Sequence, residues 1–459
     1  MTNQVNIIFE NDEKISSNQQ LQEFVENTPA TYAISWVEQE LSIVVKKGTE
    51  SLENIRMTAG AIARDVMNRK VDQVFVDANN LIQFYSALED GQVVTAFVEG
   101  WNLGTYQFTR YKSEEVRLAP ELNILNDEPY AAYVQAGNNR AEATAFSRDL
   151  MNEIPSTLNP ESFPEVLLNE FKDTNVEINV LHKSELEKQG MHGVLTVGRG
   201  SKYEPSFVEL TYCSDDSKPL VALVGKGVTF DTGGISLKKG KDISSMRMDM
   251  GGAAAVAGAM KLLEASAAKA NVVAFIPIVE NMPDSNAVLP GEVIHYKNGS
   301  TVQVGNTDAE GRLILADGLI RAGEIKAEYV VDIATLTGSI MNALGTKLAG
   351  VFGDEELAME MKRIGEQNGD FNWPMPLVDA YDQYLNSDFA DFSNTSSKAE
   401  AGSITASLFL RRFVPKTAKW LHVDMAGVMM SQEKGYYTKA ATGFGARLLA
   451  DYTEYISRP

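Results

Sequence analysis

The chain has 459 residues, 44% of them hydrophobic and 22% charged. This composition is typical of a globular protein, and the length is greater than one hydrophobic core usually organises, so two domains are expected. It carries 41 Lys and Arg against 62 Asp and Glu, a net charge of −21, and this balance argues against nucleic acid or anionic lipid as a partner. No basic stretch leads into an apolar run at the start of the sequence, and no segment is apolar for the length of a membrane span, so a membrane role is not expected. The single cysteine, Cys213, excludes an internal disulfide and is expected to be a small buried residue in a reducing, cytoplasmic setting.

Residues 1–135 are expected to form a smaller N-terminal α/β domain. Short apolar runs, among them VNIIF, YAISWV, LSIVV and VVTAFV, alternate there with polar helical stretches. This part of the chain offers no cluster of chemically reactive residues. A helix ending near Met151, a break at Ile154–Pro155 and a new helix capped near Asn159 are expected to join it to the next domain.

Residues 136–459 are expected to form a larger C-terminal α/β domain with a central mixed sheet. Apolar runs predicted to be strands alternate with Ala-rich helical stretches such as GGAAAVAGAMKLLEASAAKA, a pattern typical of α/β domains. The predicted strands are VLTVG, FVELTY, LVALVG, NVVAFIPIV and YVVDIATL.

Charged residues gather in segments that follow these predicted strands. The strand LVALVG leads into KGVTFDTGGISLKKG, a later segment reads SSMRMDMGGAAA, and a third reads NTDAEGRL, in which charged and small residues alternate. These segments contribute four carboxylates, two lysines and an arginine: Asp231, Asp249, Asp308, Glu310, Lys226, Lys238 and Arg312.

Four carboxylates in one small site raise one another's pKa unless cations lie between them. Clusters of this kind suit divalent metals, and two ions about 3.5–4 Å apart can stabilise both the attacking and the developing oxygen of a hydrolytic step. The lysines and the arginine would then balance charge and hold an oxyanion. None of the four histidines lies in these segments, which argues against a histidine zinc site.

Structural explanations exist for each residue taken alone. Asp308 and Arg312 could form a surface ion pair, Asp249 could cap a helix, and Lys226 could occupy an exposed turn. A phosphate loop is disfavoured because the pattern GxxxxGK[ST] is absent. The carboxylate cluster by itself also permits a two-metal phosphoesterase.

Three polar residues lie within apolar segments of the second half of the chain. His422, in WLHVDMAG, is expected to be a core histidine with its hydrogen bonds satisfied. Asp424 beside it, and Asp332 in VVDIATLTG, are either core residues or additional members of the site.

The octapeptide NTDAEGRL resembles the signature of the leucyl, or cytosol, aminopeptidases, the two-metal M17-type peptidases. Further blocks resemble this family in the same order, from about residue 140 to the C-terminus. They are GKGVTFDTGGISLK, MRMDMGGAAAV, ENMPDSNAVLPGEVI, DIATLTG, AGSITASLFL and KAATGFG. The first 135 residues or so resemble it only in position and α/β character.

The resemblance implies a metallo-exopeptidase with two divalent ions and bicarbonate as cofactors. One ion would be held tightly by Lys226, Asp231, Asp249 and Glu310. A second, more exchangeable ion would be held by Asp231, Asp308 and Glu310. The ions would be Mn²⁺ or Zn²⁺, with Co²⁺ and Mg²⁺ as alternatives.

The family mechanism assigns further roles. A metal-bridging hydroxide is the nucleophile, Lys238 would stabilise the oxyanion, and a bicarbonate on Arg312 would be the general base. Bicarbonate contacts would come from Ala309, Gly311, Arg312 and Leu336. The first side-chain pocket would be lined by Met246, Thr335 and Gly338, which favours Leu-like or Met-like residues.

The implied substrates are short peptides trimmed from a free N-terminus, and the implied assembly is a homohexamer. An alternative is a DNA-binding or regulatory homologue, because some bacterial relatives double as recombination accessory factors. The acidic balance argues against that alternative.

Overall fold

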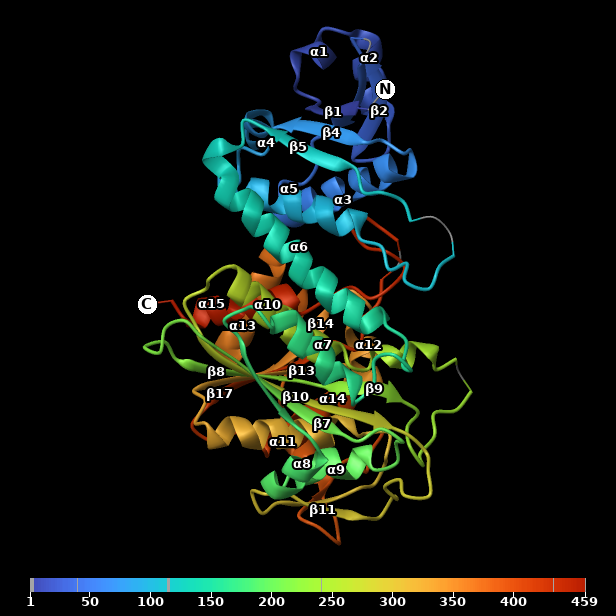
Figure 1. The fold of residues 1–459 in the computed structure, drawn as a ribbon, viewed down its shortest axis with the longest axis vertical. Coiled ribbons are helices and arrows are strands. Elements are labelled where there is room, and N and C mark those ends of the chain that lie inside the picture. Colours follow the sequence, from blue (N-terminus) through green and yellow to red (C-terminus); the bar gives the residue numbers. More distant parts are fainter. Residues whose placement is uncertain (1–3, 39, 114–115, 241, 432, 459) are drawn as a thin grey trace. The chain divides into compact units, whose positions relative to one another are not determined.

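A computed structural model describes residues 4–38, 40–113, 116–240, 242–431 and 433–458. The chain divides into two compact units (Figure 1). The first contains residues 1–145, 367–369 and 431–440, and the second contains the remainder. The long helix α6 (Ala131–Asn152) begins in the first unit and ends in the second, so a helix joins two α/β units as expected. The predicted division at residue 135 falls within this helix and stays a prediction.

The first unit is built on a five-stranded sheet in the order β2-β3-β1-β4-β5. Helices α3 and α5 cover one face with a large apolar cluster, and α1 and α2 cover the other with a smaller one. Its strands are β1 (Gln4–Phe9), β2 (Tyr32–Val37), β3 (Glu40–Val45), β4 (Gln73–Asp77) and β5 (Glu121–Leu125). Its helices are α1 (Glu13–Ser16), α2 (Gln19–Asn27), α3 (Leu52–Asn68), α4 (Ala78–Phe84), α5 (Asp90–Thr105) and the 3₁₀ turn η1 (Glu128–Tyr130).

The second unit is built on a nine-stranded mixed sheet, in the order β15-β14-β17-β13-β8-β10-β7-β6 with β9 paired to β10. Its strands are β6 (Glu177–Leu181), β7 (Ser206–Cys213), β8 (Leu220–Gly225), β9 (Gly227–Asp231), β10 (Asn271–Asn281), β13 (Tyr329–Ala334), β14 (Ala349–Gly353), β15 (Asn372–Pro374) and β17 (Lys419–Asp424). A separate small sheet contains β11 (Val293–His295), β12 (Thr301–Gln303) and β16 (Phe392–Ser393). The mixed α/β architecture expected from the sequence is confirmed.

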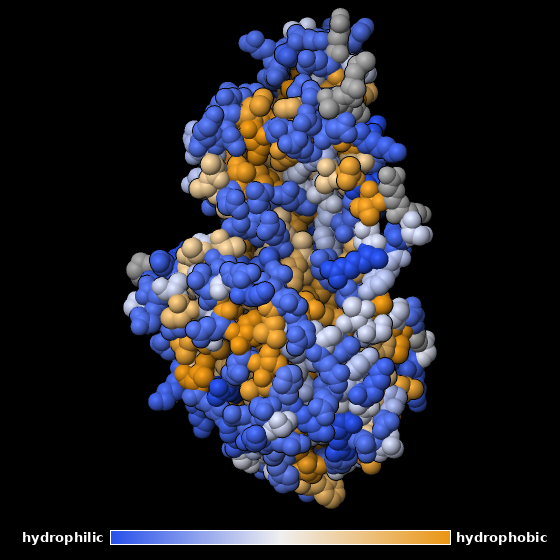
Figure 2. Space-filling view, in the orientation of Figure 1, coloured by the Kyte–Doolittle hydropathy of each residue, from blue (hydrophilic) through white to orange (hydrophobic). Residues whose placement is uncertain are grey.

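Helices cover both faces of the central sheet (Figure 1). Helices α10 and α15 pack on one face, and α9, α11 and α14 pack on the other around the main apolar cluster. The helices are α7 (Ser162–Phe171), α8 (Lys183–Gln189), α9 (His192–Gly198), η2 (Ser244–Met248), α10 (Gly251–Ala265), α11 (Gly311–Glu324), α12 (Gly338–Leu344), α13 (Glu355–Asn368), η3 (Asp379–Leu385), α14 (Gly402–Arg411) and α15 (Ala446–Ile456). Hydrophilic residues cover most of the face shown in Figure 2.

The four central strands β17, β13, β8 and β10 are mutually parallel, so their carboxyl ends meet at one edge of the sheet. In parallel sheets this edge is where loops carry binding sites. The turns that follow β8, β9, β10 and β13 therefore bring distant parts of the sequence together.

Three sequence-based expectations are wrong. The run VLTVG lies in helix α9, and VVTAFV lies in helix α5, because periodicity in a short, mostly apolar run does not distinguish a strand from a helix. Cys213 is exposed, since it is the last residue of β7, where the burial alternation of the strand turns outward.

Among the described residues, no helix is long and apolar enough to cross a membrane.

Candidate metal centre

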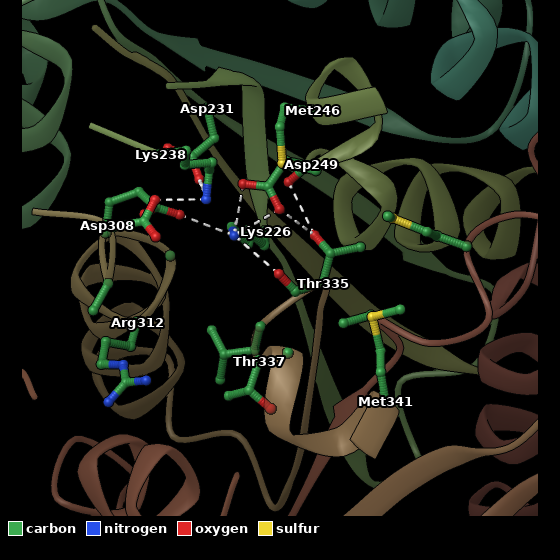
Figure 3. Close-up of a pocket in the computed structure, with 17 residues that line it drawn as sticks. Lys226, Asp231, Lys238, Met246, Asp249, Asp308, Arg312, Thr335, Thr337 and Met341 are labelled. Carbon is green, nitrogen blue, oxygen red and sulfur yellow. Dashed lines mark hydrogen bonds and ion pairs between the residues drawn. The ribbon is translucent and has the colours of Figure 1, made fainter. Parts of the chain in front are cut away.

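A cavity of about 370 Å³ opens at the carboxyl edge of the central sheet. All of the residues to which the sequence assigned a role line it: Lys226, Asp231, Lys238, Met246, Asp249, Asp308, Ala309, Glu310, Gly311, Arg312, Thr335, Leu336 and Gly338. The fold thus brings segments more than a hundred residues apart into one site (Figure 3).

Each charged residue is placed by the end of an element. Lys226 lies between β8 and β9, and Asp231 is the last residue of β9. Asp249 ends the 3₁₀ turn η2, and Glu310 precedes the first turn of α11. A carboxylate at a helix N-terminus is stabilised by the unpaired backbone N–H groups there.

Lys226 lies at the centre of the cluster, 3% exposed (Figure 3). Its Nζ donates to Asp249 Oδ1 at 2.8 Å and to the Thr335 carbonyl at 3.0 Å, and lies 3.0 Å from Glu310 Oε1. Thr335 Oγ1 donates to the same Asp249 oxygen at 2.7 Å. The tight packing explains Gly311, because a Cβ there would lie 2.5 Å from the Lys226 Cε atom.

A second lysine joins the two remaining carboxylates. Lys238 Nζ lies 2.7 Å from Asp231 Oδ2 and 2.5 Å from Asp308 Oδ1. Oxygens of Asp231, Asp308 and Glu310 lie within 4.8 Å of one another. Glu310 Oε2 is buried and has no hydrogen-bond partner among the described residues. Close carboxylate oxygens with an unsatisfied member fit divalent cations well.

The pKa values of the acids are shifted first by burial and then by the charges beside them. Burial, and then the neighbouring Glu310, raises the pKa of Asp231 to about 6, and burial raises the pKa of Asp249 to about 8 despite the Lys226 ammonium. Burial also raises the pKa of Asp308. At Glu310 the effect of burial is outweighed by Lys226 and Lys238, so its pKa is lowered.

The pKa values of the two lysines are also raised, but here the neighbouring carboxylates are the cause. Burial alone lowers the pKa of Lys226, but the Asp249, Glu310 and Asp231 carboxylates outweigh it and raise the pKa. Lys238 follows the same pattern, with Asp231 as the main carboxylate. Both ammonium groups therefore act as counter-ions. A metal ion bound beside a lysine would instead lower the pKa of that lysine.

Arg312 lies at the side of the cavity, away from Lys226 in Figure 3. One terminal nitrogen donates to the Asn394 carbonyl at 2.8 Å, and Nε has no hydrogen-bond partner among the described residues. Burial lowers the pKa of the guanidinium to about 10, and the group remains charged at neutral pH. A buried cation with a free N–H is suited to a small anion.

Part of the cavity lining is apolar. Met246 and Leu336 contribute to it, as do three residues that sequence reasoning did not assign: Met341, Ala426 and Met429. No atom lies within 4 Å of the Cβ position at Gly338. The cavity therefore joins a charged side to an open apolar side.

The two aspartates left open by the sequence have different surroundings. Asp332 is fully buried and accepts hydrogen bonds from Trp420 Nε1 at 2.7 Å and His422 Nδ1 at 2.5 Å, so it belongs to the core. Asp424 is also buried but accepts hydrogen bonds from Leu336 N at 3.2 Å and Thr337 Oγ1 at 2.6 Å. It therefore holds the loop that follows β13, which lines the cavity.

Sequence reasoning also missed two buried amides. Asn394 Oδ1 accepts from Gly305 N at 2.8 Å, and its Nδ2 donates to the Asn306 and Ala309 carbonyls at 2.8 and 3.2 Å, which fixes the loop before α11. Asn281, at the end of β10, donates to Asp231. A polar residue at the carboxyl end of an apolar strand was the signal for Asn281.

Two models of one protein family match parts of the chain. The sequence model described as "Cytosol aminopeptidase family, catalytic domain" matches residues 145–450, and the N-terminal domain model of the same family matches residues 46–115.

Individual proteins give the same result. The chain is 38% identical over 421 residues to a probable cytosol aminopeptidase of Chlorobium limicola, covering 88% of this chain and 83% of that protein. It is 43% identical over 368 residues to one of Xanthobacter autotrophicus, covering 76% and 72%. A solved structure, the bottromycin maturation enzyme BotP in complex with Mn, superposes with a TM-score of 0.90 at 30% identity over 100% of both chains.

Proposed function

We propose a peptide-trimming role for this chain, which belongs to the cytosol aminopeptidase family and is accordingly a metal-dependent aminopeptidase. In this proposal it removes N-terminal residues with medium apolar side chains, such as Leu or Met, from short peptides. One observation carries it: a single cavity combines an acidic cluster short of positive charge with an apolar wall.

The proposed metal ligands are the residues whose oxygens converge. One ion would be held by Lys226, Asp231, Asp249 and Glu310, and a second by Asp231, Asp308 and Glu310. The close oxygens and the unpaired Glu310 Oε2 support this assignment. When bound, two divalent ions lower the pKa of water and polarise an amide carbonyl. We propose Mn²⁺ or Zn²⁺, with Co²⁺ and Mg²⁺ as alternatives, and the Mn complex of the similar enzyme BotP supports Mn²⁺.

Two residues of the chain are proposed to act on the reacting peptide bond. Lys238 is 23% exposed at its side chain, which makes it more accessible than Lys226 at 3%. Its ammonium can therefore donate to the oxygen that gains negative charge as the carbonyl is attacked. Arg312, through its free N–H, would hold a bicarbonate anion with contacts from Ala309, Gly311 and Leu336, and the bound anion would supply a general base.

The apolar part of the cavity lining is proposed to select the N-terminal side chain. Met246, Thr335 and Gly338 line the cavity together with Met341 and other apolar residues. The open space at Gly338 leaves room for a branched or unbranched aliphatic group. Flexible methionines adapt to side chains of similar volume, which supports a preference for Leu and Met over charged residues.

Three broader assignments complete the proposal. The N-terminal domain is placed at residues 1–135 and the catalytic domain at 136–459. The protein is proposed to work in the cytoplasm, in keeping with a single cysteine. A homohexamer is proposed as the assembly, and light scattering of the purified protein would measure its mass directly.

The test is release of amino acid from leucine anilide after chelator treatment and again after Mn²⁺ or Zn²⁺ is restored. Activity is expected only with metal and only on the free amine, so N-acetyl-leucine anilide is the matched control. Hydrolysis of p-nitrophenyl phosphate in place of the anilide would instead support a two-metal phosphoesterase. Metal-replete protein that releases no leucine would contradict the proposal.

A further inference from the structure

Asn281 is buried at the point where two strands of the central sheet reach the metal centre. It is the last residue of β10, is 2% exposed, and lies opposite Asp231 in the parallel pairing of β10 with β9. Its backbone carbonyl accepts from Thr232 N at 3.1 Å and from the Thr232 hydroxyl at 2.8 Å. The backbone of Asn281 is therefore held both by its own strand and by the residue that follows the neighbouring one.

The side-chain amide of Asn281 spans the two loops that carry the carboxylates. Nδ2 donates to Asp231 Oδ1 at 2.8 Å and to the Thr307 carbonyl at 3.0 Å. Asp231 Oδ1 also accepts from Gly233 N at 2.8 Å. These two donors set the plane of the Asp231 carboxylate and leave Oδ2 directed at Lys238, 2.7 Å away.

The same two loops are joined a second time through Thr307. Its hydroxyl donates to the Gly233 carbonyl at 2.6 Å and accepts from Ser236 N at 2.8 Å. Thr307 directly precedes Asp308 in NTDAEGRL. Asn281 and Thr307 therefore form one brace between the loop of Asp231 and the loop of Asp308.

The chain also leaves room for this amide. Gly234 has φ +61°, and a Cβ there would lie 2.7 Å from Asn281 Oδ1. An amide suits the position electrostatically as well, because it supplies two N–H donors without adding a fifth negative charge to the cluster. An aspartate of the same shape would provide neither N–H.

We propose that Asn281 is a positioning residue for the metal centre, which holds Asp231 and the loop of Asp308 in the arrangement that binds divalent ions. This inference rests on the proposed function, since it concerns the same ligands. Groups that orient metal ligands typically change metal affinity by about 10–100-fold when they are removed. Asn281 acts through Asp231 and Thr307 and does not contact the cavity itself.

The experiment measures Mn²⁺ binding to the chelator-stripped full-length protein by calorimetry, with leucine anilide hydrolysis followed against Mn²⁺ concentration. Asn281→Ala removes both donations, and Asn281→Leu removes them while filling the space. Asn271→Ala is the matched control, because Asn271 begins the same strand at its opposite end.

We expect Asn281→Ala and Asn281→Leu to weaken Mn²⁺ binding by about 10–100-fold. The Mn²⁺ concentration for half-maximal activity should rise by the same factor, while saturating Mn²⁺ restores kcat to within a few-fold and leaves KM for the anilide unchanged. Asn271→Ala should match the wild type. A purely structural role would lower the unfolding temperature of the metal-free variants without shifting the Mn²⁺ dependence.

Two results would overturn the inference alone: variants that bind Mn²⁺ as tightly as the wild type, or variants that both fail to fold even in saturating Mn²⁺. A wild-type protein that binds no Mn²⁺ and releases no leucine would overturn the proposed function, and this inference with it. The wild-type titration therefore separates the two failures.

Discussion

In the first unit the buried Arg56 donates from Nε to Glu99 at 2.7 Å, and Arg140 lies 3.3 Å from the same carboxylate. In the second unit four carboxylates share one cavity with two lysines. In the first set two arginines face two carboxylates, because Arg56 also lies 3.4 Å from Glu53 Oε2. The second set has more carboxylates than cations, an unpaired Glu310 oxygen and space beside it.

The difference separates buried charge that supports a fold from buried charge that supports chemistry. A buried ion pair with matched partners stabilises its surroundings only modestly but is costly to break. Carboxylates whose pKa values are raised in a cavity are candidates for function, because ordinary folding gives no reason to keep them together. Substitutions in the first set should therefore lower stability and leave kcat unchanged. Substitutions in the second set should lower kcat.

The largest effect on stability is expected from Glu99→Leu. It leaves the Arg56 guanidinium buried without that carboxylate, and breaking a buried pair typically costs about 3–5 kcal/mol of unfolding free energy. Urea denaturation should show this loss, while kcat per folded molecule stays at the wild-type value. Gln92→Leu, an exposed position on the same helix α5, is the control. Loss of kcat without loss of stability would break the comparison.

Lys238→Ala should give the reverse signature. Removal of one oxyanion donor typically lowers kcat by about 10²–10³-fold, and Lys238 is the proposed donor. Mn²⁺ affinity should be no weaker than in the wild type, because an ammonium group no longer competes for Asp231 and Asp308. Steady-state kinetics at saturating Mn²⁺ and calorimetry give the two values, with the exposed neighbour Lys239→Ala as control. Unchanged kcat would remove Lys238 from the mechanism.

Asp317 provides a third kind of buried acid, whose expected effect is a dependence of stability on pH. It is 4% exposed in α11 and accepts from Val194 N at 2.8 Å, and burial raises its pKa to about 8. The folded state therefore keeps a proton that the unfolded chain releases above about pH 4, so this group lowers stability progressively as pH rises toward 8.

Asp317→Asn removes this titration while keeping a carbonyl-type acceptor for the backbone. The unfolding temperature of the variant relative to the wild type should increase from pH 4 to pH 8, as measured by calorimetry at each pH. Asp173→Asn, at an exposed position, is the control. A difference that stays constant across this range would show that Asp317 does not titrate there.

Much of the site was predictable because strand ends and short motifs are local features. The alternation in NTDAEGRL and the run from LVALVG into Lys226 already indicated charged loops at one edge of a sheet. The apolar wall was harder to predict, since Ala426 and Met429 lie more than a hundred residues from Asp308 in the sequence. Spacing carries no information about which distant loop closes a cavity.

The supporting residues were missed for the same reason. Asn281 is hydrogen-bonded to Asp231, which lies 50 positions away in the sequence, and Asn394 is hydrogen-bonded to Asn306, which lies 88 positions away. The helix at VLTVG was missed because a short, mostly apolar run fits either a strand or a helix. Hydrogen bonds and burial on all sides are tertiary properties, and they appear only once the chain is folded.

The most direct test of the central claim is anomalous diffraction from crystals grown with Mn²⁺. The account predicts two Mn²⁺ peaks per chain, bounded by Lys226, Asp231, Asp249, Asp308 and Glu310, with Arg312 outside the coordination shell. Crystals of active protein whose anomalous peaks lie elsewhere, or that show none among these carboxylates, would contradict it.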